Sequence, residues 1–396
     1  MTNALRRIVV VGNGIAGLTA ADSLRAEGFD GELTIVGDEA RAAYSRPALS
    51  KAVLRSDDDL TAHELPAPDH GATEVLGVTA TALDTGRRVL SLDDGSELDY
   101  DGLVVASGSR ARRLGSGSDE LVLRTLDDAL ALRARIAARP DLVVVGGGPL
   151  GMEVASGALG AGCRVTLVTN APPMARHLGT HLSEAITAAA VARGLTVIVT
   201  SDVRVAERHG GSTAVLADGR LVEGDLLVTA VGDIPNTGWL AGSGLPSSGP
   251  LAVDSRGRVR PEIVAAGDVA AVPTASGQAR SPLWNSAIEQ ARVAARALLR
   301  GDEAPELDAQ PYFWTEQFDL NVRVAGRTPL AGTPEVVDGD GPAGPALLRW
   351  RHADGTATAV SVNYRIPIPR LRRLCEAAAS PARPTSARRT TRTSGR

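Results

Sequence analysis

The sequence is nearly devoid of lysine. Of the 42 basic residues in the 396-residue chain only Lys51 is a lysine, which leaves 42 − 1 = 41 arginines. Arginine stays charged under all physiological conditions, whereas the pKa of a lysine ammonium moves readily with its surroundings. A chain that uses arginine elsewhere and keeps one ammonium indicates a functional role for Lys51, with a chance surface lysine as the alternative.

Cysteine is also scarce. Cys163 and Cys375 lie far apart in the sequence, so neither a disulfide framework nor a local CxxC or CxxxxC redox pair can be written. This excludes enzymes whose second redox centre is a local disulfide. Of the six histidines, only His177 and His181 are spaced for one helix face, and no third ligand accompanies them, so we expect no metal site.

Long apolar runs are missing, and the charge is nearly balanced. No run reaches the roughly 18 to 20 residues of a membrane span, and residues 1–7 lack the apolar core of a signal peptide. A net charge of −4 provides no general attraction to nucleic acid or to anionic membranes. We therefore expect a cytoplasmic protein that binds neither nucleic acid nor membrane.

What the chain does contain is a branched apolar run that leads into a GxGxxG motif. In such a motif the first glycine allows a tight turn, the second lets backbone approach a pyrophosphate, and the third lets helix and strand pack closely. Residues 8–11 predict the strand before the motif, residues 32–36 the strand after its helix, and Asp38 follows where a carboxylate can bind a ribose hydroxyl. The glycines of the motif are Gly12, Gly14 and Gly17, and Ala16 lies between the last two. The stretch predicts a dinucleotide site; a glycine-rich turn in another α/β protein is the alternative.

A second unit of the same kind begins 146 − 12 = 134 residues later. A strand at 142–145 precedes its glycines, a helix carries Glu153, and the next strand covers 164–168. The residues of this loop are Gly146, Gly148, Leu150 and Gly151. Each phosphate cradle serves one pyrophosphate, so the repeat predicts two dinucleotides.

The rest of the chain alternates β-rich and helical segments. Helices are expected at 125–139 and 285–299, and residues 309–376 show hairpin-like alternation. Four of the eleven aromatic residues fall within residues 312–318, where they form either an aromatic platform or a small core. Strands are expected at 75–80, 103–106, 196–199, 225–231 and 263–266. The fourth ends at Gly232, and the last ends in Gly267 and Asp268 before a helix. Hairpin turns are expected around 93–95 and 218–219. From residue 377 the chain is arginine-rich without apolar periodicity, which predicts disorder.

Two segments are specific enough to resemble a known family. Residues 44–51 (YSRPALSK) are similar to the YxRPPLSK segment, and residues 312–318 (YFWTEQF) to the WFWSDQY segment, of the FAD-dependent ferredoxin reductases of bacterial oxygenase systems. Residues 123–129 and 265–268 also resemble family segments, and the likeness covers about residues 5–375.

The resemblance implies an α/β fold of the glutathione-reductase type. Two Rossmann-like domains would bind FAD (1–110 and 235–308) and NAD(P)H (111–234), followed by a small α+β C-terminal domain (309–376) and a disordered arginine-rich tail (377–396). FAD would contact the first glycine motif, Asp38 at the adenosine ribose, Arg46 and Lys51 near the ring system, and Asp268 at the ribityl chain. Weaker assignments to FAD are Val78, Arg124, Leu283 and Trp284. Lys51 would pair with Glu153 beside the flavin, and Trp314 would line the route by which electrons leave.

The function that follows is electron transfer from NADH or NADPH through FAD to a small iron-sulfur ferredoxin, which supplies an oxygenase, by resemblance a haem monooxygenase. The chain departs from the family at Thr169 and Asn170, where NADH-dependent members carry a glutamate, and only Arg176 follows a few residues on. NADH is slightly favoured over NADPH. The alternatives are an NAD(P)H oxidase or small-molecule reductase, and a flavoprotein whose redox state controls binding to a partner.

Overall fold

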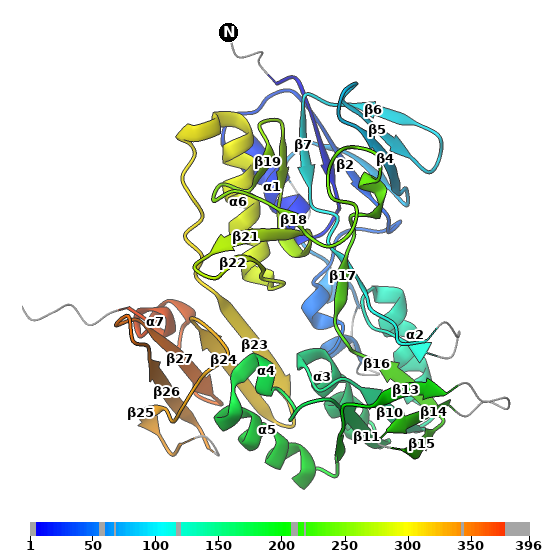
Figure 1. The fold of residues 1–396 in the computed structure, drawn as a ribbon, viewed down its shortest axis with the longest axis vertical. Helices are drawn as coiled ribbons and strands as arrows, with labels where there is room; N and C mark the ends of the chain where they lie inside the picture. Colours follow the sequence, from blue (N-terminus) through cyan, green and yellow to red (C-terminus); the bar gives the residue numbers. More distant parts are fainter. Residues whose placement is uncertain are drawn as a thin grey trace, which may run out of the picture.

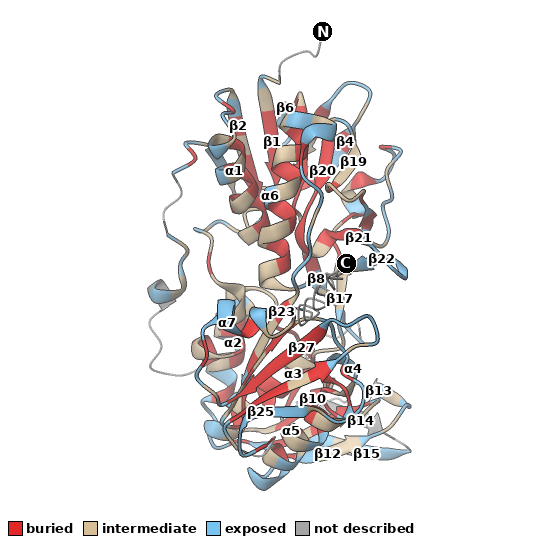
Figure 2. Ribbon diagram, turned by 90° about the vertical axis from the view of Figure 1, so that its left-hand side faces the viewer, coloured by how far each residue is buried: buried red, intermediate tan, exposed pale blue. Residues whose placement is uncertain are grey.

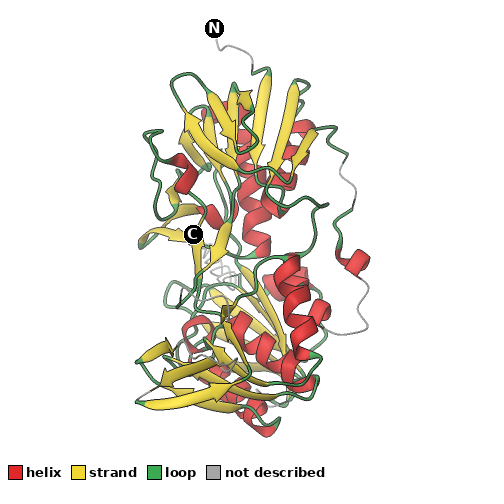
Figure 3. Ribbon diagram, turned by 90° about the vertical axis from the view of Figure 1, so that its right-hand side faces the viewer, coloured by secondary structure: helices red, strands yellow, loops and turns green. Residues whose placement is uncertain are grey.

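The computed structural model describes residues 5–54, 60–66, 69–115, 120–206, 213–217, 219–341 and 344–376. The fold is α/β, with strands gathered into an upper and a lower group along the long axis of the molecule (Figures 1 and 3). Within the described part of the chain, no helix has the length and apolar character needed to cross a membrane. The arginine-rich tail lies outside the described residues.

The upper group is built on a six-stranded sheet that takes strands from two distant parts of the chain. Its order is β19-β20-β7-β1-β2-β3, parallel except for β19. The strands are β1 (Arg7–Val11), β2 (Glu32–Gly37), β3 (Thr73–Leu76), β7 (Gly102–Val105), β19 (Arg258–Arg260) and β20 (Ile263–Ala265). Strands from residues 258–265 thus complete the sheet begun at residue 7.

Both faces of this sheet are covered, which explains the continuous apolar run in β1. Ile8 and Val10 pack toward α1 (Ile15–Ala26) and α6 (Trp284–Arg300), whereas Val9 and Val11 pack on the opposite side. That side is covered by a small antiparallel sheet of β4 (Ala80–Asp84), β5 (Val89–Leu92) and β6 (Glu97–Asp99). Figure 2 shows the sheet buried between these layers.

Two local predictions in this region were wrong. The expected strand at 75–80 is interrupted because Gly77 adopts φ +72°, so β3 ends at Leu76 and β4 begins at Ala80. Asp268 does not lead into a long helix: it lies in a single 3-10 turn, η5 (Gly267–Val269), which passes directly into a strand. That strand belongs to the sheet of β18 (Leu251–Ala252), β21 (Ala270–Thr274) and β22 (Gly277–Arg280).

The lower group contains a second parallel sheet, in the order β12-β11-β10-β16-β9. Its strands are β9 (Glu120–Leu121), β10 (Asp141–Val145), β11 (Arg164–Thr169), β12 (Thr196–Val199) and β16 (Leu226–Thr229). The helices that share its core are α2 (Leu126–Ile136), α3 (Pro149–Gly160), α4 (Ala175–Leu178) and α5 (Thr180–Ala192). The other face is covered by β13 (Val203–Ala206), β14 (Thr213–Ala217) and β15 (Arg220–Gly224).

A two-stranded ribbon, β8 (Ser109–Ala111) with β17 (Asp233–Pro235), connects the two parallel sheets. Further short 3-10 turns are η1 (Arg46–Ala48), η2 (Ala52–Leu54), η3 (Leu60–His63), η4 (Gly238–Leu240) and η6 (Gly301–Glu303).

The C-terminal part is a five-stranded antiparallel sheet with one short helix. Its order is β23-β24-β27-β26-β25, and the elements are β23 (Tyr312–Gln317), β24 (Leu320–Ala325), β25 (Glu335–Gly339), β26 (Ala346–Arg351), β27 (Ala357–Val362) and α7 (Ile368–Arg373). Val322 and Leu348 share one buried core with Met152 of α3 and Leu182 of α5. This packing brings β23 against α3.

Candidate functional site

The first glycine motif forms a close turn between β1 and α1. Gly12 adopts φ +119°, and a Cβ there would lie 2.1 Å from the carbonyl oxygen of Ala106 at the end of β7. A Cβ on Gly17 would lie 1.8 Å from the Gly12 carbonyl oxygen, so helix and strand approach too closely for any side chain. Gly14 has no atom within 4 Å of its Cβ position and lines the adjoining cavity. The turn thus leaves the helix N-terminus open to a ligand phosphate.

A cavity of about 860 Å³ extends from this turn. Its lining comes from the upper sheet, from α3 at the second glycine motif, and from β23. The volume lies within the range of about 300–1,000 Å³ typical of small-molecule and cofactor sites. The predicted site residues that line it are Gly12, Gly14, Ala16, Asp38, Arg46, Lys51, Arg124, Leu150, Glu153, Asp268, Leu283, Trp284 and Trp314.

The other predicted residues lie outside the cavity wall. Gly17 is behind the turn, and Val78 packs under the upper sheet, where its N–H donates to the Gly37 carbonyl at 3.1 Å. The residues of the second cradle that do not line the cavity are Gly146, Gly148, Gly151 and Gly232.

Lys51 lines the cavity where the loop after β2, α3 and β23 come together. Its Nζ is 2.8 Å from Glu153 Oε2, and the two side chains are only 13% and 5% exposed. The expected ion pair is therefore present, between the loop after β2 and α3. Lys51 Nζ also lies 5.9 Å from the centroid of the Trp314 ring, close enough for a cation–π contact.

Glu153 receives two further hydrogen bonds. Thr315 Oγ1 of β23 donates to Oε1 at 2.6 Å, and Ser50 Oγ donates to Oε2 beside the lysine. The Thr315 hydroxyl accepts in turn from Gln317 Nε2 at 2.8 Å. Buried carboxylates are stable when such charge-assisted bonds satisfy both oxygens, so the network fixes the orientation of Glu153.

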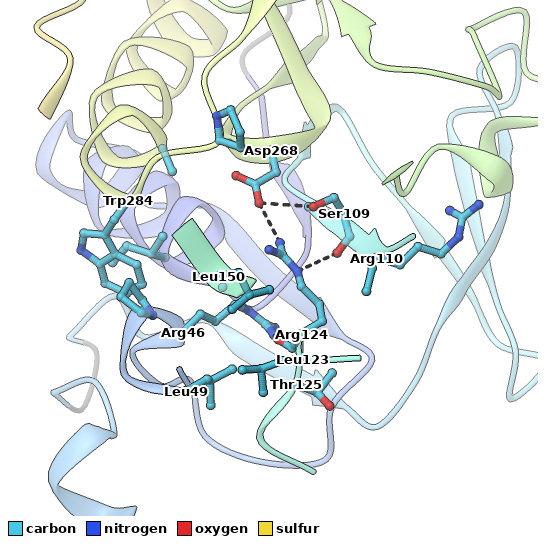
Figure 4. A pocket seen from close by; sticks show the side chains of 18 of the residues that line it. Arg46, Leu49, Ser109, Arg110, Leu123, Arg124, Thr125, Leu150, Asp268 and Trp284 are labelled. Carbon is cyan, nitrogen blue, oxygen red and sulfur yellow. Dashed lines mark hydrogen bonds and ion pairs between the residues drawn. The ribbon is translucent and has the colours of Figure 1, made fainter. Parts of the chain in front are cut away.

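A second ion pair spans the cavity near the end of β20. Arg124 Nη2 lies 2.7 Å from Asp268 Oδ2, and Arg124 Nε donates to the Ser109 carbonyl at 2.9 Å (Figure 4). Ser109 Oγ donates to the same Asp268 oxygen at 3.3 Å. One oxygen of Asp268 is thereby held, which leaves Oδ1 to accept from a ligand hydroxyl.

Arg46 is held by a cluster near Asp38. Its Nη2 lies 2.5 Å from Glu39 Oε1, its Nη1 donates to the Arg124 carbonyl at 2.9 Å, and the Tyr44 hydroxyl donates to Glu39 Oε2 at 2.7 Å. Burial is the largest cause of the raised pKa of Tyr44, so its phenol stays protonated. Arg46 thus lies beside the carboxylate pair Asp38 and Glu39 after β2.

The second glycine motif repeats the geometry of the first. Gly146 adopts φ +118°, a Cβ on it would lie 2.2 Å from the Ala230 carbonyl oxygen, and a Cβ on Gly151 would lie 1.9 Å from the Gly146 carbonyl oxygen. Gly232 follows β16 at φ +99°. The agreement between the two units supports the prediction of two dinucleotide cradles.

The histidine pair considered for a metal is split between two helices. Gly179, at φ +80°, separates α4 with His177 from α5 with His181, whose ring contacts Trp350 edge-on at 6.0 Å. Among the described residues no group of three potential ligands could hold a metal ion.

Known proteins with similar sequences and structures agree with a fold that binds two dinucleotides. The family model described as pyridine nucleotide-disulphide oxidoreductase covers residues 6–296. A probable ferredoxin reductase of Castellaniella defragrans is 36% identical over 376 residues, 90% of each chain. The ferredoxin–NAD(+) reductase component of the p-cumate 2,3-dioxygenase system of Pseudomonas putida is 33% identical over 86% of this chain and 85% of its own. In a crystal structure of the covalent putidaredoxin reductase–putidaredoxin complex, a chain 28% identical superposes with a TM-score of 0.83, over 94% of this chain and 93% of that one.

The chain belongs to the ferredoxin reductases of bacterial oxygenase systems. It is therefore an oxidoreductase of the two-dinucleotide fold, as the sequence motifs predict. The glycine turns and the cavity between them fit FAD, because the close backbone approaches leave no room for side chains where a pyrophosphate must lie.

Unlike members of the wider family that use a disulphide, this chain has no redox cysteine pair. Cys163 Sγ lies 3.7 Å from the Ile136 carbonyl and Cys375 Sγ lies 3.1 Å from the Ala325 carbonyl, in separate core clusters. Burial raises the pKa of both thiols. Neither cysteine lines the cavity, so both are packing residues.

Sequence reasoning missed several residues of the site. Glu39, Tyr44, Ser50, Ser109 and Thr315 all hold predicted site residues in place. Tyr44, Ser50 and Thr315 lie inside the two family-like segments, so their position was a usable signal. Nothing in the sequence pointed to Ser109 or Glu39 themselves, apart from their nearness to predicted site residues.

Proposed function

We propose that the protein passes electrons from a nicotinamide dinucleotide through FAD to a small iron-sulfur ferredoxin that supplies an oxygenase. The observation that carries the proposal is the buried pair of Lys51 and Glu153, which lies in a cavity reached by both glycine units and by β23. When bound, FAD supplies the exchange between a two-electron donor and a one-electron acceptor.

The residues assigned to FAD follow the cavity. The first glycine turn would bind the pyrophosphate, Asp38 the adenosine ribose and Asp268 the ribityl chain. Asp38 lines the cavity, and Arg124 and Ser109 occupy one Asp268 oxygen while no group in the described part of the chain donates to the other, which supports these roles. Val78 and Arg46 stay weaker proposals, because Val78 lies outside the cavity wall and Arg46 is engaged with Glu39.

Lys51 supplies positive charge where electrons enter the site. A fixed ammonium in a partly desolvated place stabilises developing negative charge far more than the same group in water. Glu153, held by Ser50 and Thr315, fixes the ammonium in position. Leu150 lines the cavity at the second cradle and would shield one face of the ring system, and Trp314 would line the exit toward the ferredoxin.

The electron donor would bind the second cradle through Gly146, Gly148, Gly151 and Gly232. The name of the Pseudomonas putida relative includes NAD(+), which supports NADH as a donor here. The domain division stays a proposal as well, with FAD held by residues 1–110 and 235–308 and the donor by residues 111–234. The composition of the two parallel sheets supports this division. The cytoplasmic location stays a prediction.

The experiment is reduction of cytochrome c by the purified holoprotein under NADH, with and without a 2Fe–2S ferredoxin. A large ferredoxin-dependent rate supports the proposal. Ferredoxin-independent consumption of oxygen would support an NAD(P)H oxidase, and turnover confined to small acceptors would support a small-molecule reductase. The binding-flavoprotein alternative would require a partner that binds only one redox state.

The class of the terminal oxygenase is a more specific proposal than the reduction of a ferredoxin. We propose a haem monooxygenase, on the likeness of residues 44–51 and 312–318 to the family segments. The Pseudomonas putida relative is the reductase component of a dioxygenase system, so a dioxygenase is the alternative to a haem monooxygenase. Reconstitution of substrate turnover with the native ferredoxin and each class of oxygenase decides between them.

A further inference from the structure

The segment after β11 differs from what an NADH-only site requires. In dinucleotide folds, a carboxylate after the second strand of the unit binds the adenosine ribose hydroxyls, and it repels a 2′-phosphate. Here β11 ends at Thr169, whose side chain is buried and donates to the Ala171 carbonyl at 2.9 Å. Asn170 follows, exposed and uncharged. The position therefore neither binds the ribose as a carboxylate does nor repels an anion.

The chain after Asn170 returns to the second glycine cradle. The Met174 N–H donates to the Gly147 carbonyl at 2.7 Å, and His177 Cε1 lies 3.4 Å from the position a Cβ would take on Gly148. Arg176 lies between these two contacts in the sequence, on the exposed side of α4. The loop thus places Arg176 between two residues that contact the dinucleotide cradle.

Arg176 forms no ion pair with a carboxylate in the described part of the chain. The next strand, β12, runs alongside, with Thr200 N–H donating to the Thr169 carbonyl at 2.8 Å, and the acid that follows it, Asp202, already accepts from Arg204 Nε at 3.2 Å. Partial desolvation and the nearby Arg176 lower the pKa of His177, so Arg176 is the cation of this loop at neutral pH.

We propose that Arg176, with Asn170, forms a subsite for the 2′-phosphate of NADPH, so that the protein uses NADPH as well as NADH. An arginine fork binds a phosphate with paired charge-assisted hydrogen bonds. The inference rests on the proposed function only in that the second cradle must bind a nicotinamide dinucleotide.

Binding is measured first, by calorimetric titration of the FAD-loaded protein with 2′,5′-ADP and with 5′-ADP. We expect 2′,5′-ADP to bind more tightly to the wild type. Arg176→Ala should weaken 2′,5′-ADP by about tenfold or more, as expected when a charge-assisted hydrogen bond is lost, and leave 5′-ADP unchanged. Arg164→Ala, at the opposite end of β11 and paired with Asp141, is the matched control and should change neither ligand.

Kinetics with ferricyanide as acceptor provide the second readout without any ferredoxin. Asn170→Glu should lower kcat/KM for NADPH by about tenfold and preserve NADH turnover, because it restores a carboxylate that repels the 2′-phosphate. Equal binding of the two nucleotides to the wild type, or equal weakening of both by Arg176→Ala, would overturn the subsite. Failure of NADH as well would overturn the proposed function too, whereas failure of ferredoxin reduction alone would leave the subsite standing.

Discussion

Replacement of Lys51 by methionine tests the central ion pair most directly. The change keeps an unbranched side chain but removes the ammonium that lies 2.8 Å from Glu153 Oε2. The hydroxyls of Ser50 and Thr315 remain as donors to the carboxylate. Breaking a buried pair on one side costs about 3–5 kcal/mol, and with two donors left we expect about 3 kcal/mol of lost unfolding free energy.

The free energy is measured by urea unfolding of the FAD-loaded protein at one fixed excess of FAD, since the ligand itself contributes to stability. Lys51→Met, Glu153→Gln and the double variant form a cycle in which the double variant should lose less than the sum by about 1–3 kcal/mol. Arg327→Met is the control: its pair with Asp354 is 57% and 51% exposed, so we expect a loss of less than about 1 kcal/mol. If Lys51→Met costs no more than this control, the pair does not stabilise the site as argued.

The same variant addresses catalysis. Loss of one preorganised charge that stabilises developing charge costs about 10²–10³ in rate, so flavin reduction by NADH in anaerobic stopped-flow should slow by about 10²-fold. Arg327→Met should reduce at the wild-type rate. An unchanged rate in Lys51→Met would remove the role assigned to the ammonium, even if the stability cycle behaves as expected.

Three further changes follow from the structure. Thr315→Val removes a 2.6 Å hydrogen bond to the same carboxylate and should slow flavin reduction about tenfold, whereas Thr315→Ser keeps the hydroxyl and the wild-type rate, as stopped-flow would show. Gly12→Ala places a Cβ 2.1 Å from a carbonyl oxygen at φ +119°, so it should cost about 3 kcal/mol of unfolding free energy and abolish the absorbance of bound flavin. Gly157→Ala is its control within α3: the new Cβ would lie 3.6 Å from Leu54 Cδ1, an ordinary contact, so the change should be neutral or stabilising by about 0.5–1 kcal/mol. The Tyr100 hydroxyl is buried without a hydrogen-bond partner among the described residues, so Tyr100→Phe should stabilise the protein by about 1 kcal/mol in urea unfolding. Because burial raises the pKa of Tyr100 to about 12, the wild type should lose stability between pH ~10, where the unfolded phenol ionises, and pH 12, and the phenylalanine variant should lack this loss.

The sequence identified the parts of the fold that depend on local rules. Gly12 and Gly146 follow apolar strands and precede helices, and both adopt the positive φ that only glycine takes without strain. Local rules failed at residues 75–80. The composition of this segment favours one continuous strand, but the positive φ of Gly77 breaks it. A sequence pattern also does not show that β20 pairs with β7, since these strands are separated by the whole second unit.

The candidate site was predictable to a similar extent. Lys51 could be singled out because it is the one lysine of the chain, and Glu153 because it lies on the helix that follows the second glycine motif. Thr315 was not assigned, because its contact with Glu153 joins residues 162 positions apart and forms only when β23 packs on α3. The hydrogen bonds that orient the Lys51–Glu153 ion pair depend on tertiary packing, which motif recognition does not describe.

The hydrogen bonds of Glu153 also explain why the single lysine stands at this position in a chain of arginines. Oε2 accepts from Lys51 and Ser50, whereas Oε1 accepts from Thr315. An arginine fork binds best when it reaches both oxygens of a carboxylate, and here Oε1 is already occupied. A compact ammonium needs only one oxygen, and it leaves its remaining donors for the Pro47 carbonyl, 3.2 Å away, and for the cavity. The network around the carboxylate, rather than charge alone, therefore selects lysine.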